Sequence, residues 1–207
     1  MADNYLERRM EELHSLKPHR PVSASQRRLV PWVLPQLRVV IVNGCCAEGE
    51  AVVRQLAEAG SRLSVIDSRF EAGKLMASRL GIRYAEADTS LSDSLRTALD
   101  STLKAWRDID VVICIDMQKW LLSDVADALA EHRRTYPRVS SYEPRIILVN
   151  ADAADRGSED TAFGGTETEG NKVQEIVTGD DTAPDITARL CLFLALPVNS
   201  SLPRFSV

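Results

Sequence analysis

The feature that most constrains this chain is a run of branched apolar residues that ends in a glycine-containing turn. Residues 39–42 read Val-Val-Ile-Val, and Asn43-Gly44 follows directly. From Ala47 to Ala59 the apolar residues recur at helical spacing, and Gly60 then supplies a residue that commonly ends a helix. The segment predicts a buried strand, a tight turn and an amphipathic helix, which is how a parallel α/β domain begins.

A turn of this kind can hold the pyrophosphate of a dinucleotide, because backbone N–H groups and the positive end of the helix dipole meet at a helix N-terminus. Here Glu48 and Glu50 lie in the first turn of the predicted helix. Their carboxylates stabilise the helix N-terminus but repel an anionic ligand. Asp67 follows Gly44 at about the spacing of the acid that binds an adenosine ribose. The residues therefore predict the fold, whereas the signals for a cofactor disagree with one another.

Strand and helix patterns alternate along the rest of the chain. We expect strands at residues 37–42, 63–66, 83–87, 110–115, 145–149, 173–177 and 204–207. We expect helices at residues 47–59, 70–80, 91–106, 121–134 and 185–196. This alternation predicts a parallel sheet with right-handed crossovers and helices on both faces. The sequence therefore predicts a Rossmann-like, doubly wound α/β fold with about six to seven strands.

Two segments interrupt this pattern. Residues 1–36 contain an apolar stripe at helical spacing and then several prolines, so we expect an N-terminal extension made of a helix and a proline-rich linker. The stripe consists of Leu6, Met10, Leu13 and Leu16. Residues 151–172 are rich in glycine and acidic residues and predict a flexible acidic loop where a crossover helix belongs. The Rossmann-like domain is expected to span residues 37–207, with one crossover helix lost.

Composition narrows the class of protein. A chain of 207 residues that is 44% apolar can form one α/β domain with a sizeable core. The net charge of −5 argues against binding to nucleic acid or to anionic membranes. There is no apolar run that could span a bilayer and no signal-peptide pattern, so we expect a cytoplasmic protein.

The cysteines and histidines do not form a metal-binding pattern. The four cysteines are Cys45, Cys46, Cys114 and Cys191. They lack the spacing of a zinc site, and the three histidines are scattered, so we expect buried free thiols and no metal site. Alternatively, the neighbouring Cys45 and Cys46 are redox-active if they are exposed.

Four segments, taken in order, resemble a known family. Residues 50–60 (Glu-Ala-Val-Val-Arg-Gln-Leu-Ala-Glu-Ala-Gly) resemble its first helix, and residues 87–89 (Ala-Asp-Thr) resemble the end of its third strand. Residues 106–112 (Trp-Arg-Asp-Ile-Asp-Val-Val) resemble the approach to its fourth strand. Residues 188–195 (Ala-Arg-Leu-Cys-Leu-Phe-Leu-Ala) resemble its late helix. The family is that of the short-chain dehydrogenases/reductases, and the resemblance implies a fold typical of NAD(P)-dependent oxidoreductases.

The resemblance also implies a set of cofactor-binding residues. The family's turn is Thr-Gly-x-x-x-Gly-x-Gly, and Gly44 and Gly49 match its first and last glycines. The turn here is one residue shorter and lacks the middle glycine, at which the backbone approaches the pyrophosphate most closely. By resemblance, Asp67 would select NAD and Asp88 would contact the adenine; alternatively, both are polar residues at strand ends, as in almost any α/β sheet. The resemblance therefore implies at most weak NAD binding.

The family's catalytic residues have no counterpart in the sequence. Its chemistry needs a Tyr-x-x-x-Lys pair on one helix face, where the lysine lowers the pKa of the tyrosine. The tyrosines are Tyr5, Tyr84, Tyr136 and Tyr142, and none has a lysine four residues later. The supporting serine falls at or near Ala151, and residues 114–117 replace the Asn-Asn-Ala-Gly turn of the family. We therefore predict no catalytic residues from this set.

A different chemistry at the carboxyl edge of the predicted sheet is an alternative. Polar residues follow the fourth and fifth predicted strands, namely Asp116, Asn150, Asp152 and Asp155. Such a group could hold Mg²⁺ or act as acid and base. Residues of these types also commonly support turns at strand ends, and this structural interpretation is preferred.

Three hypotheses about function follow. The leading one is a degenerate, non-catalytic relative of the family with a binding, regulatory or structural role, in a homo-oligomer or a complex with a homologue of the same family. The second is an NAD-dependent oxidoreductase with a rearranged active site. The third is an interaction module that binds its partner through residues 1–36. We expect the apolar stripe of that segment, or the residues around Trp32, to cover the sheet surface that the lost helix leaves exposed.

Overall fold

The computed structural model describes residues 37–118, 120–137, 142, 144–151, 167–168, 171–178, 183–195 and 204–206. The predicted N-terminal extension, residues 1–36, lies outside the described residues. Residues 152–166, which contain most of the predicted acidic loop, also lie outside them.

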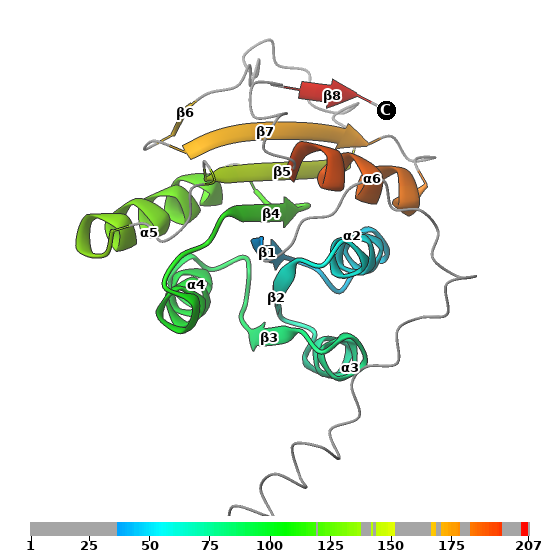
Figure 1. Ribbon diagram of the computed structural model, residues 1–207, viewed down its shortest axis with the longest axis horizontal. Helices are drawn as coiled ribbons and strands as arrows, with labels where there is room; N and C mark the ends of the chain where they lie inside the picture. Colours follow the sequence, from blue (N-terminus) through cyan, green and yellow to red (C-terminus); the bar gives the residue numbers. More distant parts are fainter. Residues whose placement is uncertain are drawn as a thin grey trace, which may run out of the picture. The chain divides into compact units, whose positions relative to one another are not determined.

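Within the described residues, a single sheet of eight strands forms the centre of the fold (Figure 1). The strands are β1 (Arg38–Val42), β2 (Arg62–Asp67), β3 (Arg83–Glu86), β4 (Val111–Ile115), β5 (Arg145–Ala151), β6 (Glu167–Thr168), β7 (Asn171–Thr178) and β8 (Arg204–Ser206). Their order in the sheet is β3-β2-β1-β4-β5-β7-β6, and β8 also pairs with β7. Every pair is parallel except β6–β7. The order reverses between β1 and β4, as in a doubly wound fold.

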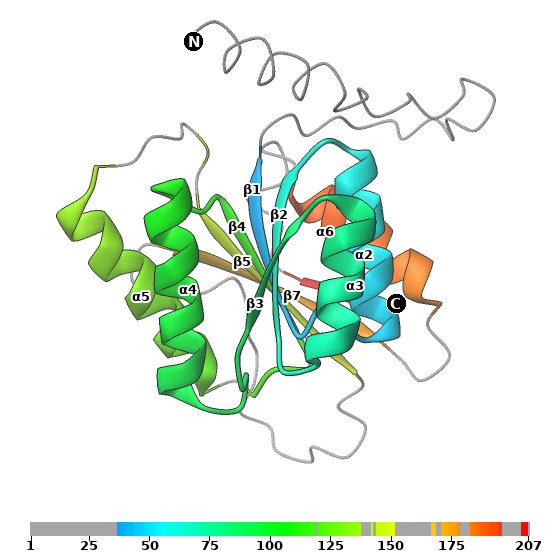
Figure 2. The same ribbon diagram turned by 90° about the horizontal axis from the view of Figure 1, so that it is seen from below.

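Helices cover both faces of the sheet. On one face lie α2 (Ala47–Glu58), α3 (Phe70–Leu80) and α6 (Pro184–Ala195), and on the other lie α4 (Ser92–Trp106) and α5 (Leu121–Thr135), as Figure 2 shows. These elements match the predicted ones to within one or two residues at most ends. The predicted Rossmann-like, doubly wound α/β fold is therefore confirmed.

The prediction of a loop over residues 151–172 was wrong at both ends. Ala151 is the last residue of β5, and Asn171 and Lys172 are the first residues of β7. Between them, Glu167–Thr168 forms β6, antiparallel to the start of β7. A two-residue strand is too short to give an alternating pattern in the sequence. It forms because it pairs with the neighbouring strand β7. Apart from this two-residue strand, the described residues contain the seven strands that the sequence predicted.

The core forms where branched residues of the central strands meet the helices. Val39, Val40, Ile41 and Val42 of β1 are all fully buried, because helices pack on both faces of this strand. A strand in this position is apolar at every residue rather than at every second one. Val52, Val53 and Leu56 of α2 are fully buried as well. This packing fixes the end of β1 and the start of α2, between which the candidate site lies.

At the amino end of the sheet, a buried ion cluster joins β1 to β4. The Arg38 guanidinium contacts Asp110 (Nε to Oδ2, 3.0 Å) and Asp108 (Nη2 to Oδ2, 3.3 Å), and both carboxylates are 2% exposed. The Arg38 backbone N–H also donates to Asp110 Oδ2 at 2.9 Å. Part of the segment that resembles the family, residues 106–112, therefore has a structural role far from the carboxyl edge.

Candidate functional site

The carboxyl ends of β1, β2 and β4 form the edge at which α/β folds bind ligands. Asn43, the residue after β1, links all three strands. Its backbone N–H donates to Ile66 O (2.9 Å), and its side-chain Nδ2 donates to Ile115 O (2.8 Å). The hydroxyl of Thr89 donates to Asn43 Oδ1. Asn43 has a φ of 60°, a left-handed conformation that asparagine adopts more readily than most residues. The sequence placed Asn43 in the turn but gave no sign of these contacts.

Gly44 and Gly49 bring the turn and helix α2 into direct contact. A Cβ atom on Gly49 would lie 2.5 Å from the carbonyl carbon and oxygen of Gly44. A Cβ atom on Gly44 would lie 2.9 Å from Cγ1 of Val65 in β2. Both distances are shorter than real Cβ atoms tolerate, so both positions require glycine for packing. This role matches that of the glycine that allows close helix–strand packing in dinucleotide-binding turns.

The two cysteines between these glycines are structural. Cys46 is the N-cap of α2: its sulfur accepts the Gly49 N–H at 3.3 Å, and its thiol donates to Asn43 O at 3.3 Å. Cys45 is 7% exposed. Burial, together with the nearby Asp67 carboxylate, raises the pKa of Cys45 to about 12, and burial also raises the pKa of Cys46. Both thiols are therefore protonated at neutral pH, which disfavours the redox alternative.

The Asp67 side chain is buried within the same turn and already has hydrogen-bond partners. Its Oδ2 accepts the backbone N–H of Cys45 at 2.9 Å, and its Oδ1 accepts the backbone N–H of Arg69 at 2.9 Å. The Arg69 guanidinium donates to the two oxygens at 3.2 and 3.3 Å. The Asp67 residue is 2% exposed. A ribose hydroxyl would have to displace one of these donors, so this arrangement fits a dinucleotide poorly.

The charge on Asp67 is stabilised by these donors. Burial alone would raise the pKa of the Asp67 carboxyl, but the hydrogen bonds from Arg69 and from the Cys45 N–H outweigh burial and lower the pKa. Arg69 is half exposed, so its guanidinium covers the outer side of the carboxylate. Asp67 is therefore an ionised group whose hydrogen bonds hold the β1–α2 turn against the end of β2.

Asp88 is exposed and supports a different turn. Its Oδ1 accepts the backbone N–H of Ser90 at 3.0 Å and the Ser90 hydroxyl at 2.6 Å, and these bonds lower the pKa of Asp88. The Asp88 backbone N–H donates to Ser94 Oγ at 2.9 Å. The structure thus brings Gly44, Gly49 and Asp67 into one unit, whereas Asp88 belongs to the turn between β3 and α4.

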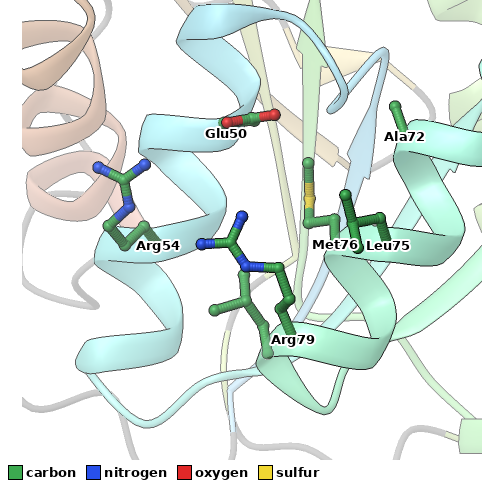
Figure 3. A pocket seen from close by; sticks show the side chains of 7 residues that line it. Glu50, Arg54, Ala72, Leu75, Met76 and Arg79 are labelled. Carbon is green, nitrogen blue, oxygen red and sulfur yellow. The ribbon is translucent and has the colours of Figure 1, made fainter.

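Two cavities occur among the described residues, and Glu50, in the first turn of α2, lines the first of them. One, of about 130 Å³, lies between α2 and α3, as Figure 3 shows. The other, of about 470 Å³, lies at the C-terminal ends of α4 and α5. Its lining residues are Leu103, Lys104, Arg107, His132, Tyr136 and Pro137. The lining residues of both cavities exclude all four predicted cofactor-binding residues.

The alternative magnesium site is only partly described. The Asp116 backbone N–H donates to Val149 O at 2.8 Å, which joins the loop after β4 to β5. Asp152 and Asp155 lie outside the described residues. Among the residues that are described, there is no group of three or more His, Cys, Asp or Glu that could hold a metal ion.

Comparison with known proteins places this geometry among related folds. No protein-family model matches the chain. Zerumbone synthase from Zingiber zerumbet is 27% identical over 78 residues, which cover 36% of this chain and 29% of that protein. The chain thus spans about 29% of the length of this curated relative.

Solved structures match over most of the chain. A short-chain dehydrogenase from Burkholderia cenocepacia in complex with NADP has a TM-score of 0.63 and 15% identity, over 84% of this chain and 97% of that one. A short-chain dehydrogenase/reductase from Brucella melitensis, a glucose/ribitol dehydrogenase, has a TM-score of 0.66 and 16% identity, over 85% and 97% of the two chains. The chain has the short-chain dehydrogenase/reductase fold. The resemblance found in the sequence is confirmed at this level. Among the described residues, this fold includes no helix long and apolar enough to cross a membrane.

In this fold the described tyrosines are not placed for proton transfer. The Tyr84 hydroxyl donates to the backbone oxygen of Asp67 at 2.9 Å, and burial raises its pKa to about 12. Short-chain dehydrogenases need a tyrosine with a lowered pKa, so this shift has the wrong direction. Tyr136 caps the C-terminus of α5 and stacks on His132 at 4.9 Å, whereas Tyr142 precedes β5. Both therefore lie toward the amino ends of the strands; Tyr5 lies outside the described residues.

Proposed function

We propose that this protein is a non-catalytic relative of the short-chain dehydrogenases/reductases that serves a binding, regulatory or structural role. The observation that carries the proposal is the buried Asp67 carboxylate, which accepts the Cys45 N–H of the β1–α2 turn. In an active dinucleotide site, the acid at this strand end binds ribose and the turn's N–H groups face the pyrophosphate. Here the two groups bind each other, and the turn is stabilised without a ligand.

Charge and chemistry support the same proposal. Glu48 and Glu50 place two carboxylates in the first turn of α2, at the end of the helix that would otherwise attract a diphosphate. Tyr84 has a raised pKa and a backbone acceptor, so it does not serve as a proton donor. Under this proposal, the protein has the fold of an oxidoreductase, and the β1–α2 turn and Asp67 stabilise the edge of the sheet instead of binding a dinucleotide.

The alternative function is an NAD-dependent oxidoreductase with a rearranged site. It is favoured by the presence of Gly44, Gly49, Asp67 and Asp88 at family-like positions and by the NADP bound to one of the structural relatives. In this chain, NAD would have to displace one of the donors that already bind the buried Asp67 carboxylate, which costs on the order of 1–3 kcal/mol. We therefore propose that any NAD binding at this edge is weak.

Titration with NAD, NADH, NADP and NADPH separates the two functions. We expect dissociation constants of about 1 mM or weaker by calorimetry, a binding free energy of roughly −4 kcal/mol or less in magnitude. We also expect no change in nicotinamide absorbance at 340 nm with a panel of carbonyl substrates. Micromolar binding would show that the turn opens for a dinucleotide, and hydride transfer to any substrate would overturn the pseudo-enzyme proposal. If weak binding is measured, an Asp88→Ala variant with unchanged affinity would show that the dinucleotide does not contact Asp88.

The third hypothesis, an interaction module, concerns residues outside the described part. We propose that residues 1–36 take part in a homo-oligomer or in a complex with a homologue, because their apolar stripe needs a surface to pack on. Deleting residues 1–30 is expected to lower the melting temperature or to change the mass measured by light scattering. Unchanged values of both would exclude this role.

A further inference from the structure

One face of α3 is exposed although it contains apolar and charged residues in a regular order. Glu71, Ala72, Leu75, Ser78 and Arg79 recur at spacings of three and four residues, which places them on one side of the helix, and all five are exposed. Leu75, at the centre, is 61% exposed. We call these five residues the α3 face.

Beside the α3 face lies the smaller of the two cavities (Figure 3). Ala72, Leu75 and Arg79 line it from α3, together with the buried Met76, and Arg54 lines it from α2. Its volume of about 130 Å³ is below the roughly 300–1,000 Å³ of sites for drug-sized ligands. Its lining combines four apolar residues with three charged ones, Glu50, Arg54 and Arg79, and a cavity of this size suits a side chain of another protein better than a small molecule.

The charges of the α3 face are self-complementary. Glu71 and Arg79 lie four residues before and four residues after Leu75. Neither forms an ion pair within the described part of the chain. A twofold axis through Leu75 would set a second α3 antiparallel to the first and bring each Glu71 opposite the Arg79 of the other copy. The same axis would bring Ala72 opposite Ser78, and both are small enough to let two helices approach closely.

We propose that the α3 face is the interface of a homodimer, in which two copies of this chain pack their α3 helices antiparallel about Leu75. Such an interface is isologous, because each residue contacts in the partner the residue that in turn contacts it. The two Leu75 side chains lie at the centre, and two Glu71–Arg79 ion pairs flank them. This inference does not rest on the proposed function. The α3 face lies on the side of the helix opposite to the side that packs on the sheet.

The size of the interface sets its strength. Helix α3 has 11 residues and is therefore about 16 Å long. A pair of such helices buries less than the roughly 1,200–2,000 Å² of stable interfaces, even with the neighbouring α2 residues included. We expect a reversible dimer with a dissociation constant in the micromolar range, on the order of 10–100 μM.

Charge reversal tests this interface in the full-length chain. Sedimentation equilibrium from about 5 to 300 μM should show a monomer–dimer equilibrium for the wild type. Arg79→Glu and Glu71→Arg should each raise the dissociation constant at least about tenfold, because each variant places like charges together twice. The matched controls are Lys104→Glu on α4 and Asp127→Arg on α5, which make the same charge changes at exposed positions on the other face of the sheet. They should leave the constant unchanged.

Mixing the variants distinguishes a lost interface from a damaged fold. Arg79→Glu carries two acidic groups on the α3 face and Glu71→Arg carries two basic ones, so an equimolar mixture should form a heterodimer with two restored ion pairs. The double variant Glu71→Arg/Arg79→Glu should dimerise by itself, with a constant within about threefold of the wild type. A wild type that stays monomeric at 300 μM would overturn the proposal. The proposal would also be overturned if the control variants raised the dissociation constant equally, or if the mixture of Arg79→Glu and Glu71→Arg stayed monomeric.

Discussion

Replacing Gly49 by alanine is expected to lower the free energy of unfolding by about 2–3 kcal/mol. In an ordinary helix position the same change raises stability by roughly 0.5–1 kcal/mol, because alanine loses less backbone entropy on folding. Here the added Cβ would lie 2.5 Å from the Gly44 backbone, which cannot rotate away as a side chain could. Helix α2 would have to move away from the turn and lose contacts of its buried Val52, Val53 and Leu56.

Gly60→Ala provides the control for this prediction. Gly60 follows the same helix with a φ of 89°, and a Cβ atom there would have no neighbour within 4 Å. Its replacement costs only the backbone strain, about 1–2 kcal/mol. Urea unfolding followed by circular dichroism measures both variants. A Gly49→Ala protein as stable as the wild type would show that α2 can move away from the turn at no cost in free energy, and that the contact with Gly44 is not tight.

The strands and helices could be read from the sequence because their patterns are local. Strand β4 is apolar at every position and β1 at every position after Arg38, which marks strands buried on both faces. Gly60 and Gly81 both have positive φ values just after predicted helices, where glycine is favoured for that conformation. Local preference and tertiary burial agree at these positions. The fold was therefore predictable without knowledge of any contact.

The state of the candidate site was not predictable, because it depends on contacts between distant residues. The spacing of Gly44 and Asp67 indicates a ribose-binding acid, yet it contains no information on what the carboxylate faces. The structure places the Cys45 N–H against Asp67, across 22 residues of chain, and adds Arg69 from the outside. Arg69 was the one available signal, since a basic residue close after the acid supplies a local partner for its charge. The structural role of Asn43 likewise depends on Ile66, Thr89 and Ile115.

Replacing Asp67 by alanine is expected to lower the free energy of unfolding by about 3 kcal/mol. The change leaves the buried backbone N–H of Cys45 and the partly buried backbone N–H of Arg69 without their acceptor, and each such loss costs about 1–2 kcal/mol. The half-exposed Arg69 guanidinium adds little, since solvent screens its charge. Asp67→Asn keeps one acceptor oxygen and should cost about half as much. Asp88→Ala, at an exposed carboxylate in a separate turn, is the control.

The dependence on pH identifies the ionised carboxylate as the stabilising group. The pKa of Asp67 is lowered in the folded protein, so its charge stabilises the fold above the unfolded pKa of about 3.9. This stabilisation is lost as the pH falls through the lower folded pKa. The difference in unfolding free energy between the wild type and Asp67→Asn should be constant from pH 5 to pH 7 and should shrink below about pH 4. A difference that grows on acidification would mean that the pKa of Asp67 is raised.

The same variant decides whether Asp67 serves the fold or a ligand, because each oxygen of the buried carboxylate already accepts two hydrogen bonds and a ribose hydroxyl would have to displace a donor. If Asp67 serves the fold, about 0.2 mM NAD, well below the expected dissociation constant, leaves the melting temperature of the wild type unchanged, while Asp67→Ala lowers it without any ligand. If Asp67 binds ribose, NAD raises the melting temperature of the wild type and loses this effect in Asp67→Asn. The structure favours the first outcome, since both oxygens of Asp67 are already bonded within 3.3 Å and the side chain is buried. A residue that marks nucleotide binding elsewhere in this fold would then act here as the anchor of the turn.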